Sequence, residues 1–403
     1  MQLKSGTKFV QSAKTCFYCS FFHHFFDDIL IFIARFELVE ERIYQIALSA
    51  LNGLGPVKAR LLLEAVGSLE GVFNEKEAAL TKLEGFGSSI INALDRDKAI
   101  ERAKQEIEFI EENNVQLYYF QDANFPQKLK EINDCPIVLY ALGKVDFNQT
   151  NISIVGMRKS TSYGKKICDQ IVKDLTPHEI QIISGLAHGI DKVAHEAAIH
   201  NGLPTIGVLG HGLDTMYPAA HRPLAKRMLD NGGLVTEFMS GVVGDPANFP
   251  KRNRIVAGLS EATVVIESSE SGGSLITANL ANDYNREVFA VPGPVDRETS
   301  KGCNNLIKRN RAHLLSEADD LIKVLDWEEK VDQSKQHEMD ALIADLNANE
   351  QKIIQLIKAK ETVDFDSLAF ELELSSADLS LHIFNLEMKG LTKSLAGKRY
   401  TMA

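Results

Sequence analysis

The chain has 403 residues, of which 44% are hydrophobic and 25% are charged, and its formal net charge at pH 7 is −11. That length exceeds one ordinary hydrophobic core, so we expect two or three globular domains. The acidic balance excludes a global attraction to nucleic acid or anionic membranes, and any polyanion site has to be a local basic pocket. Five scattered cysteines exclude a disulfide scaffold and indicate a reducing, cytoplasmic location.

The first 37 residues differ from the rest of the chain. Eight phenylalanines lie between Phe9 and Phe36 without helical or strand periodicity. Polar residues from His23 to Asp28 interrupt the apolar run, so the segment matches neither a secretory signal nor a membrane-spanning helix. We expect residues 1–37 to be a disordered or non-native extension, with a peripheral membrane anchor as the alternative. Cys16 and Cys19 form a lone C-x-x-C pair without the partners of a zinc site.

Residues 38–114 have the periodicity of short helices. Their two turns, Gly53-x-Gly55 and Gly85-x-Gly87, are typical of helix-hairpin-helix (SAM-like) modules, which offer backbone N–H groups to a phosphate. Lys58 and Arg60 supply positive charge at the first turn, and the second turn is followed by none. A small helical bundle that keeps both turns for their geometry is an equally strong interpretation.

Residues 115–325 alternate apolar runs with helical stretches. This alternation predicts a Rossmann-like α/β fold, with a mostly parallel sheet and helices on both faces. The loops after the strands of such a sheet gather the ligand site. The predicted strands are Pro136–Gly143, Ile152–Val155, Ile180–Ile183, Pro204–Leu209, Gly233–Thr236, Ala262–Glu267 and Glu287–Val291.

The remainder of the chain predicts a linker and a small third domain. Residues 326–344 are acidic and have few apolar anchors. Residues 345–403 predict three helices and a two-stranded ribbon, the outline of a winged-helix domain. Its third helix either contacts duplex DNA or belongs to a protein-interaction module. This helix has two acidic residues, Asp378 and Glu387, and one basic residue, Lys389. The second interpretation therefore has at least equal weight.

The common nucleotide and catalytic motifs are missing from the sequence. Gly156 and Gly164 are too far apart for a P-loop, and Lys166 stands where a Mg²⁺-binding hydroxyl would be. Met157 and Arg158 follow Gly156, so the G-x-G-x-x-G fingerprint is also absent. There is no H-E-x-x-H, paired Cys-His set or G-x-S-x-G elbow. We expect no cofactor, no metal and no catalytic residue.

The loops after the predicted strands are instead rich in Gly, Ser, Thr and Arg. Small residues let backbone amides approach a phosphate chain, hydroxyls add donors, and arginines supply forked positive charge. Five such loops at one sheet edge predict a groove for a phosphodiester backbone. The loops are Gly156–Thr161, Ser184–Gly189, Gly210–Gly212, Phe249–Arg254 and Glu267–Thr277.

These residues resemble the DNA-processing protein A (DprA/Smf) family. The resemblance covers about Glu41 to Lys323 in motif order and spacing, and the acidic linker and winged-helix tail are similar as well. The motifs are Val155-Gly-x-Arg-x-x-Thr-x-Tyr-Gly164, Ser184-Gly-x-Ala-x-Gly-Ile-Asp191 with His195, Gly210-x-Gly-x-Asp214-x-x-Tyr-Pro218, Phe249-Pro-x-Arg-Asn-Arg254, Ser271-Gly-Gly-Ser-Leu-Ile-Thr-Ala278, Val291-Pro-Gly293 and Gly302-x-Asn-x-Leu-Ile307.

The resemblance implies a DNA-binding protein that is not an enzyme. Family members bind single-stranded DNA in a basic pocket of the Rossmann-like domain, protect incoming strands in natural transformation and load the RecA recombinase. They act as homodimers and have no membrane partner. Carried over by motif, the DNA-binding residues are Arg158, Phe249, Lys251 (at a variable position), Arg252, Arg254, Ser184, Gly185, Gly273 and Ser274.

Some of these residues also have a structural explanation. Arg252 and Arg254 would then pair with Glu237 or Glu267 to hold loops together. Asp191 is interpreted as a helix-start residue and His195 as a packing residue, because no nucleophile or metal set accompanies them.

Two other functions stay open. A nucleotide phosphoribohydrolase-like enzyme has a related fold with a P-G-G-x-G-T loop and a catalytic Glu. The corresponding loop here, Ser271–Ala278, lacks the third Gly, the adjacent Thr and the Glu. A winged-helix transcription factor is the other alternative, and it requires specific duplex binding.

Overall fold

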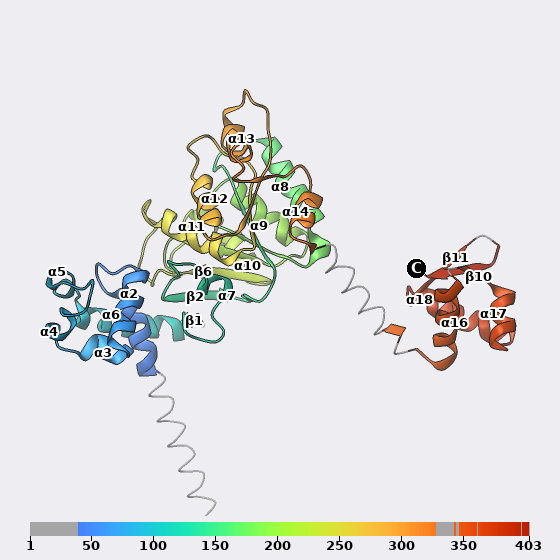
Figure 1. Ribbon diagram of the computed structural model, residues 1–403, viewed down its shortest axis with the longest axis horizontal. Helices are drawn as coiled ribbons and strands as arrows, with labels where there is room; N and C mark the ends of the chain where they lie inside the picture. Colours follow the sequence, from blue (N-terminus) through green and yellow to red (C-terminus); the bar gives the residue numbers. More distant parts are fainter. Residues whose placement is uncertain (1–38, 328–341, 344–345, 361, 396, 403) are drawn as a thin grey trace, which may run out of the picture. The chain divides into compact units, whose positions relative to one another are not determined.

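The computed structural model describes residues 39–327, 342–343, 346–360, 362–395 and 397–402 (Figure 1). These residues form two compact units that divide between Ala318 and Asp319. The predicted extension, residues 1–37, lies outside the described residues. So does the predicted linker, apart from residues 326, 327, 342 and 343.

The first unit begins with a bundle of short helices, as the sequence predicts. Asp95 sets the start of the longest of them, because its Oδ1 accepts a hydrogen bond from Lys98 N (3.2 Å). Each Gly-x-Gly turn ends directly before a helix, at Pro56 and at Ser88. No described helix is long and apolar enough to cross a membrane. The bundle contains a helix over residues 39–50, α2 (Pro56–Val66), α3 (Leu69–Asn74), α4 (Glu77–Leu80), α5 (Ser88–Ile91) and α6 (Arg96–Glu112).

A nine-stranded sheet forms the rest of this unit, within the described part of the chain, and confirms the predicted Rossmann-like class. Its order is β1-β2-β6-β5-β4-β3-β7-β8-β9, and all pairs from β6 to β9 are parallel, whereas β2 is antiparallel to both β1 and β6. All seven predicted strands are present, and β1 and β9 are additional. The strands are β1 (Gln116–Tyr119), β2 (Val138–Gly143), β3 (Asn151–Val155), β4 (Gln181–Ser184), β5 (Thr205–Val208), β6 (Gly232–Thr236), β7 (Ala262–Val265), β8 (Glu287–Ala290) and β9 (His313–Leu314).

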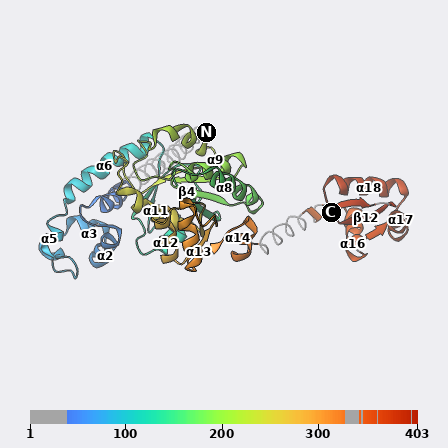
Figure 2. The same ribbon diagram turned by 90° about the horizontal axis from the view of Figure 1, so that it is seen from above.

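Helices cover both faces of the sheet (Figure 2). Two of them, α8 and α9, pack together on one face, while α11 and α12 pack together on the other. Because both faces are buried, the central strands are continuous apolar runs, and all five residues of β3 are buried. The helices are α7 (Gln127–Lys130), α8 (Ser162–Asp174), α9 (Ile190–His200), α10 (Arg222–Met228), α11 (Asn248–Leu259), α12 (Ser274–Asp283) and α13 (Lys301–Lys308). A further helix, α14 (Ala318–Val324), begins at the division between the two units.

The strand order reverses at β3, and this reversal positions the site. From β3 the chain adds β4, β5 and β6 towards one edge, and it then returns to place β7 on the other side of β3. The loops after β3 and β7 therefore leave in opposite directions and open a crevice at the carboxyl ends of the strands. Open α/β sheets bind their ligands at this switch point.

The second unit contains the winged-helix elements in the predicted order. Ser375 caps the third helix, because its Oγ accepts a hydrogen bond from Asp378 N (3.2 Å). A third strand, β10, pairs with β12 and was not predicted, since three residues are too few to give a periodicity signal. The elements are α16 (Ala348–Lys360), β10 (Thr362–Asp364), α17 (Phe365–Leu372), α18 (Ser376–Met388), β11 (Thr392–Leu395) and β12 (Arg399–Met402).

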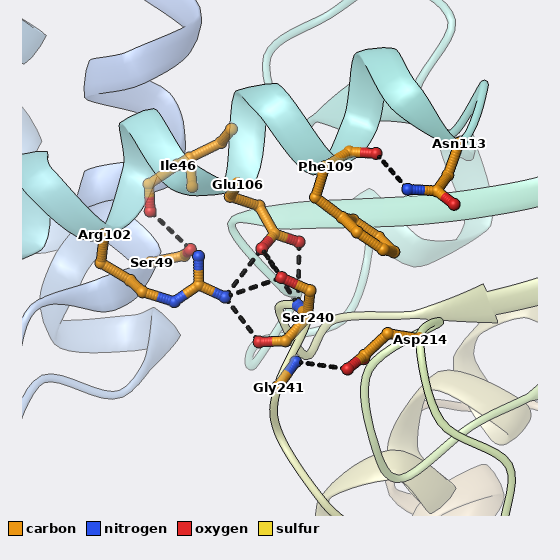
Figure 3. A network of polar contacts seen from close by, with 9 residues as sticks. All are labelled: Ile46, Ser49, Arg102, Glu106, Phe109, Asn113, Asp214, Ser240 and Gly241. Carbon is orange, nitrogen blue, oxygen red and sulfur yellow. Dashed lines mark hydrogen bonds and ion pairs between the residues drawn. The ribbon is translucent and has the colours of Figure 1, made fainter.

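A polar network joins α6 to the loop after β6 (Figure 3). Glu106, which is 1% exposed, accepts hydrogen bonds from Ser240 N (3.0 Å to each carboxylate oxygen) and from Ser240 Oγ (2.6 Å). Arg102 Nη2 donates to Glu106 Oε2 (2.8 Å) and to Ser240 O (2.5 Å). Asp214 Oδ2 accepts from Gly241 N (2.9 Å), which adds the loop after β5 to the network. These bonds fix the helical bundle to two loops of the sheet.

Apolar packing reinforces the same junction. Tyr119 of β1 and Val138 and Tyr140 of β2 belong to one buried cluster with bundle residues that include Ile46 and Leu62. The antiparallel edge of the sheet is therefore covered by the bundle, which removes its apolar side chains from water.

Removal of the Glu106 carboxylate should destabilise this junction. We expect Glu106→Ala to lower the free energy of unfolding by about 2 kcal/mol, because Ser240 N and Arg102 lose a charged acceptor. Denaturant unfolding followed by circular dichroism measures the change. Glu108→Ala, an exposed position on the same helix, is the matched control and should stay within about 0.5 kcal/mol of the parent. Equal effects of the two substitutions would contradict the assignment.

Candidate functional site

A cleft of about 630 Å³ opens at the switch point of the sheet. Its walls are the loops after β3, β4 and β7 together with the first two turns of α11, and Tyr217, Gly244 and Pro246 close it from the loops after β5 and β6. This volume is in the range of pockets that bind small molecules. Arg158, Lys159 and Arg252 line it against one acidic side chain, Asp191.

The loop after β3 places Arg158 at the cleft. Arg158 is exposed, and its guanidinium lies over the Phe249 ring, 5.3 Å from the ring centroid. Glu267, at the end of β7, holds this loop by accepting hydrogen bonds from Thr161 N (2.9 Å) and Thr161 Oγ1 (2.6 Å). Thr161 Oγ1 in turn accepts from Gly164 N (3.1 Å) and caps α8. Arg158 is therefore an exposed residue of the site, stacked over Phe249, on a loop that Glu267 anchors.

The Phe249–Arg254 motif, predicted to be a loop, forms the start of α11 instead. Pro250 is tolerated there because the first turn of a helix needs no N–H donor. The helical period then separates the motif into two faces. Phe249, Arg252, Asn253 and Val256 follow i, i+3, i+4, i+7 spacing and line the cleft.

Arg252 lies in the cleft wall, as predicted, but it is only 4% exposed. Its Nη1 donates to the carbonyl oxygens of Gly185 and Val208, so it joins the ends of β4 and β5. Burial lowers the pKa of Arg252 to about 10, with Asp191 opposing and Arg158 reinforcing this shift, so its charge is kept at neutral pH. A Cβ at position 185 would overlap this guanidinium, which explains the glycine there.

Lys251 and Arg254 line a second cavity, of about 530 Å³, and not the first cleft. Arg254 is buried and pairs with Glu237, and its Nη1 donates to Asp134 O (2.6 Å). The structural explanation is confirmed for Arg254 and Glu237, whereas Glu267 binds Thr161 and neither arginine. The basic residues of the motif therefore do not all line one cleft, because a helix cannot point successive side chains the same way.

The small residues of the prediction also separate. Gly185, Gly273 and Ser274 line the cleft. Ser184 is fully buried and does not line it, because its Oγ donates to Ile154 O (2.5 Å) within the sheet. Ser274 Oγ donates to Ser268 Oγ (3.0 Å), which holds the turn after β7. Ser184 therefore joins the end of β4 to β3 and does not face the cleft.

Tyr217 is a cleft residue that was not among the predicted DNA-binding residues, although it belongs to the motif from Gly210 to Pro218. It is 53% exposed, and its ring lies 5.7 Å from the Phe249 ring, centroid to centroid, at an interplanar angle of 35°. Lys159 and Asn253 were also missed. The signal in the sequence for Tyr217 was an aromatic residue in a glycine-rich loop after a predicted strand. An aromatic side chain that such a loop exposes to water marks a binding surface.

Asp191 and His195 have the structural roles that were predicted. Asp191 lies in the first turn of α9 and its Oδ2 accepts from Ala187 N (3.3 Å). His195 is fully buried, with Nδ1 2.7 Å from Thr205 Oγ1. Thr205 Oγ1 donates to Ile182 O (2.8 Å), so it accepts from His195 and the ring proton is on Nδ1. Burial lowers the pKa of His195 to about 3, and the ring stays neutral.

A protein-family model described as DNA recombination-mediator protein A matches residues 116–326, and a DprA winged-helix model matches residues 337–398. The chain belongs to the DprA/Smf family. Protein Smf of Synechocystis is 31% identical over 392 residues, which cover 89% of this chain and 98% of that protein. DNA processing protein DprA of Streptococcus pneumoniae is 37% identical over 202 residues, or 50% of this chain and 71% of that protein.

A solved structure agrees with the DprA/Smf assignment. The X-ray structure of S. pneumoniae DprA aligns with 29% identity and a TM-score of 0.59, over 70% of this chain and 97% of that one. The cleft lies within the part of the chain that the DprA family model matches.

The buried neutral ring of His195 should make folding sensitive to acid. The unfolded chain takes up a proton near the ordinary pKa of 6.5, whereas the folded protein does so only near 3. Stability is therefore lost as pH falls through this window, by up to about 1.4 kcal/mol per pH unit. We expect His195→Gln to weaken this pH dependence. The measurement is the difference in the free energy of unfolding between pH 7 and pH 5. The exposed His200→Gln should keep it, and parallel curves for all three proteins would contradict the prediction.

Proposed function

We propose that this protein carries out the DNA-processing role of its family by binding single-stranded DNA in the cleft at the switch point. The observation that carries the proposal is the pairing of Arg158 with Phe249 across the cleft mouth. The guanidinium offers a forked contact to phosphate, and the ring offers an apolar face to a base. The relatives named DNA processing protein support the same class of ligand.

The dimensions of the cleft favour a single strand. A volume of about 630 Å³ is that of a site for a ligand of drug size, so it holds a few nucleotide groups and not a turn of duplex. Unpaired bases are free to leave the stack and lie against Tyr217 or Phe249, which base pairing forbids in a duplex. The aromatic rings and the size of the cleft therefore support an unpaired strand as the ligand.

The charge of the cleft favours a polyanion although the chain as a whole is acidic. Three basic side chains line it, and its single acid, Asp191, is buried with its pKa raised by that burial and lowered in part by Arg252. Glycines at positions 156, 185, 272 and 273 bring backbone into the wall, where N–H groups can approach phosphate oxygens. The protein therefore presents positive charge locally, as the sequence requires.

The finer parts of the proposal come from family membership. We propose that the bound strand is passed to the RecA recombinase during natural transformation, that the protein acts as a homodimer in the cytoplasm, and that it is not an enzyme. Two experiments test the alternatives. Absence of adenine release on incubation with AMP would exclude the phosphoribohydrolase. Weak, sequence-independent duplex binding would exclude the transcription factor.

Arg158 gives the direct test. Each phosphate contact on a single strand adds about 0.7 to the slope of log affinity against log salt, so we expect Arg158→Ala to flatten that slope by about this amount. Binding should weaken for strands of every sequence, and Arg158→Glu should nearly abolish it. Fluorescence anisotropy over a salt series measures both effects. Arg309→Glu, an exposed position that lines neither cavity, is the control. A folded Arg158→Glu variant with the parent's affinity would disprove the proposal.

Arg252 should behave differently, because it is both a cleft residue and a brace. We expect Arg252→Ala to lower the melting temperature and the affinity together, since the carbonyl groups of Gly185 and Val208 lose their charged donor. Arg158→Ala should leave the melting temperature within error. Thermal unfolding of the two variants compares them, and an unchanged melting temperature for Arg252→Ala would contradict the bracing role.

A further inference from the structure

We propose that the strand bound in the cleft continues into the second cavity, where Lys58 of the helical bundle and Lys251 of α11 bind a further stretch of its phosphodiester backbone. This inference rests on the proposed function and extends the DNA path onto the bundle. It assigns a ligand to the first Gly-x-Gly turn and leaves the second without one.

The second cavity lies between two parts of the first unit. One wall is the turn from Gly53 to Lys58 at the start of α2, and the other is the face of α11 that carries Pro250, Lys251 and Arg254. Hydrogen bonding from Arg60 Nη2 to Asn133 O holds the turn beside the sheet domain. The cavity has a volume of about 530 Å³, close to that of the cleft.

Pro250 connects the two cavities, because it lines both of them. On one side of it lies the Phe249 and Arg252 face of α11, and on the other the Lys251 and Arg254 face. A strand that leaves the cleft over Pro250 therefore comes next to Lys251.

The charges of this cavity suit phosphate groups. Lys58 and Lys251 are exposed, and neither takes part in an ion pair with another described residue. Arg254 is already paired with Glu237, and the Asp134 carboxylate accepts a hydrogen bond from Tyr284 Oη (2.6 Å). The two exposed lysines thus outnumber Asp134, the one acid of the lining, and phosphate contacts by lysine position a strand without reading its bases.

The turn is also open to a backbone ligand. A Cβ built at Gly53 or at Gly55 would have no other atom within 4 Å, so a phosphate chain can approach the peptide groups there. The turn at Gly85-x-Gly87 is equally open, but it lines neither cavity. The first turn differs from the second in its position beside α11 and in the positive charge of Lys58 that follows it.

Two strand lengths separate the second cavity from the cleft. We choose labelled oligothymidylates of about 4 and about 16 nucleotides, which bracket the site sizes of single-strand binding domains. We expect Lys58→Glu to weaken binding of the longer strand by about tenfold and to flatten its salt slope, while binding of the shorter strand is unchanged. Lys82→Glu is the matched control, because it makes the same charge change at an exposed bundle position outside both cavities.

Each outcome decides one of the two proposals. If Arg158→Ala weakens both strands and Lys58→Glu weakens neither, the second cavity is not on the path and the proposed function stands. If Lys58→Glu weakens both strands equally, or weakens them no more than Lys82→Glu does, the weaker binding comes from the change in the overall charge of the protein. The inference is then wrong. If Arg158→Ala weakens neither strand, the proposed function itself fails. Thermal unfolding confirms that each variant is folded, and Lys58→Ala, which adds no repulsion, should show the same length dependence to a smaller degree.

Discussion

Arg252 donates hydrogen bonds to the carbonyl oxygens of Gly185 and Val208, and the geometry of the site depends on these contacts. They attach the start of α11 to the ends of β4 and β5. With α11 held in this way, Phe249 and Asn253 face the cleft, and Lys251 and Arg254 face the second cavity. A buried guanidinium is costly unless its donors are satisfied, and backbone carbonyls at the open end of a parallel sheet satisfy it without a carboxylate partner. Asp191 supplies the nearby negative charge that favours its charged form.

The strands of the sheet were predictable, but the division of the site between two cavities was not. Runs such as Ile152–Val155 are apolar because both faces of the sheet are covered, so the local composition predicts that these strands are buried. The segment Phe249–Arg254 contains proline, asparagine and three charged residues, and local composition therefore favours a loop. In the folded protein it is helical, and Arg252 reaches carbonyl groups that are distant in sequence and that local composition does not reveal. Likewise, nothing near Ser184 indicates that its hydroxyl bonds to Ile154 O across the sheet.

The winged-helix unit has a surface unlike that of the cleft. Leu381, Phe384 and Met388 of α18 are 59%, 58% and 73% exposed, and their i, i+3, i+7 spacing places them along one side of the helix. Duplex-reading helices present basic and amide side chains to phosphates and base edges. An apolar stripe with Asp378 and Glu387 on the same helix is unsuited to that role, and of the two interpretations of this helix it favours contact with protein.

The shared core of the helical bundle and the sheet edge also limits how this protein can be divided. Tyr119, Val138 and Tyr140 are buried by bundle residues, so a fragment that begins at residue 115 would expose the aromatic face of β1 and β2 to water. An exposed apolar face of this kind promotes self-association. Recombining parts between relatives would therefore succeed best if the bundle, β1 and β2 were exchanged as one block. The seam would then fall in the connection between β2 and β3, and the buried contacts of Leu139 and Ala141 with the rest of the sheet would have to be matched between the relatives.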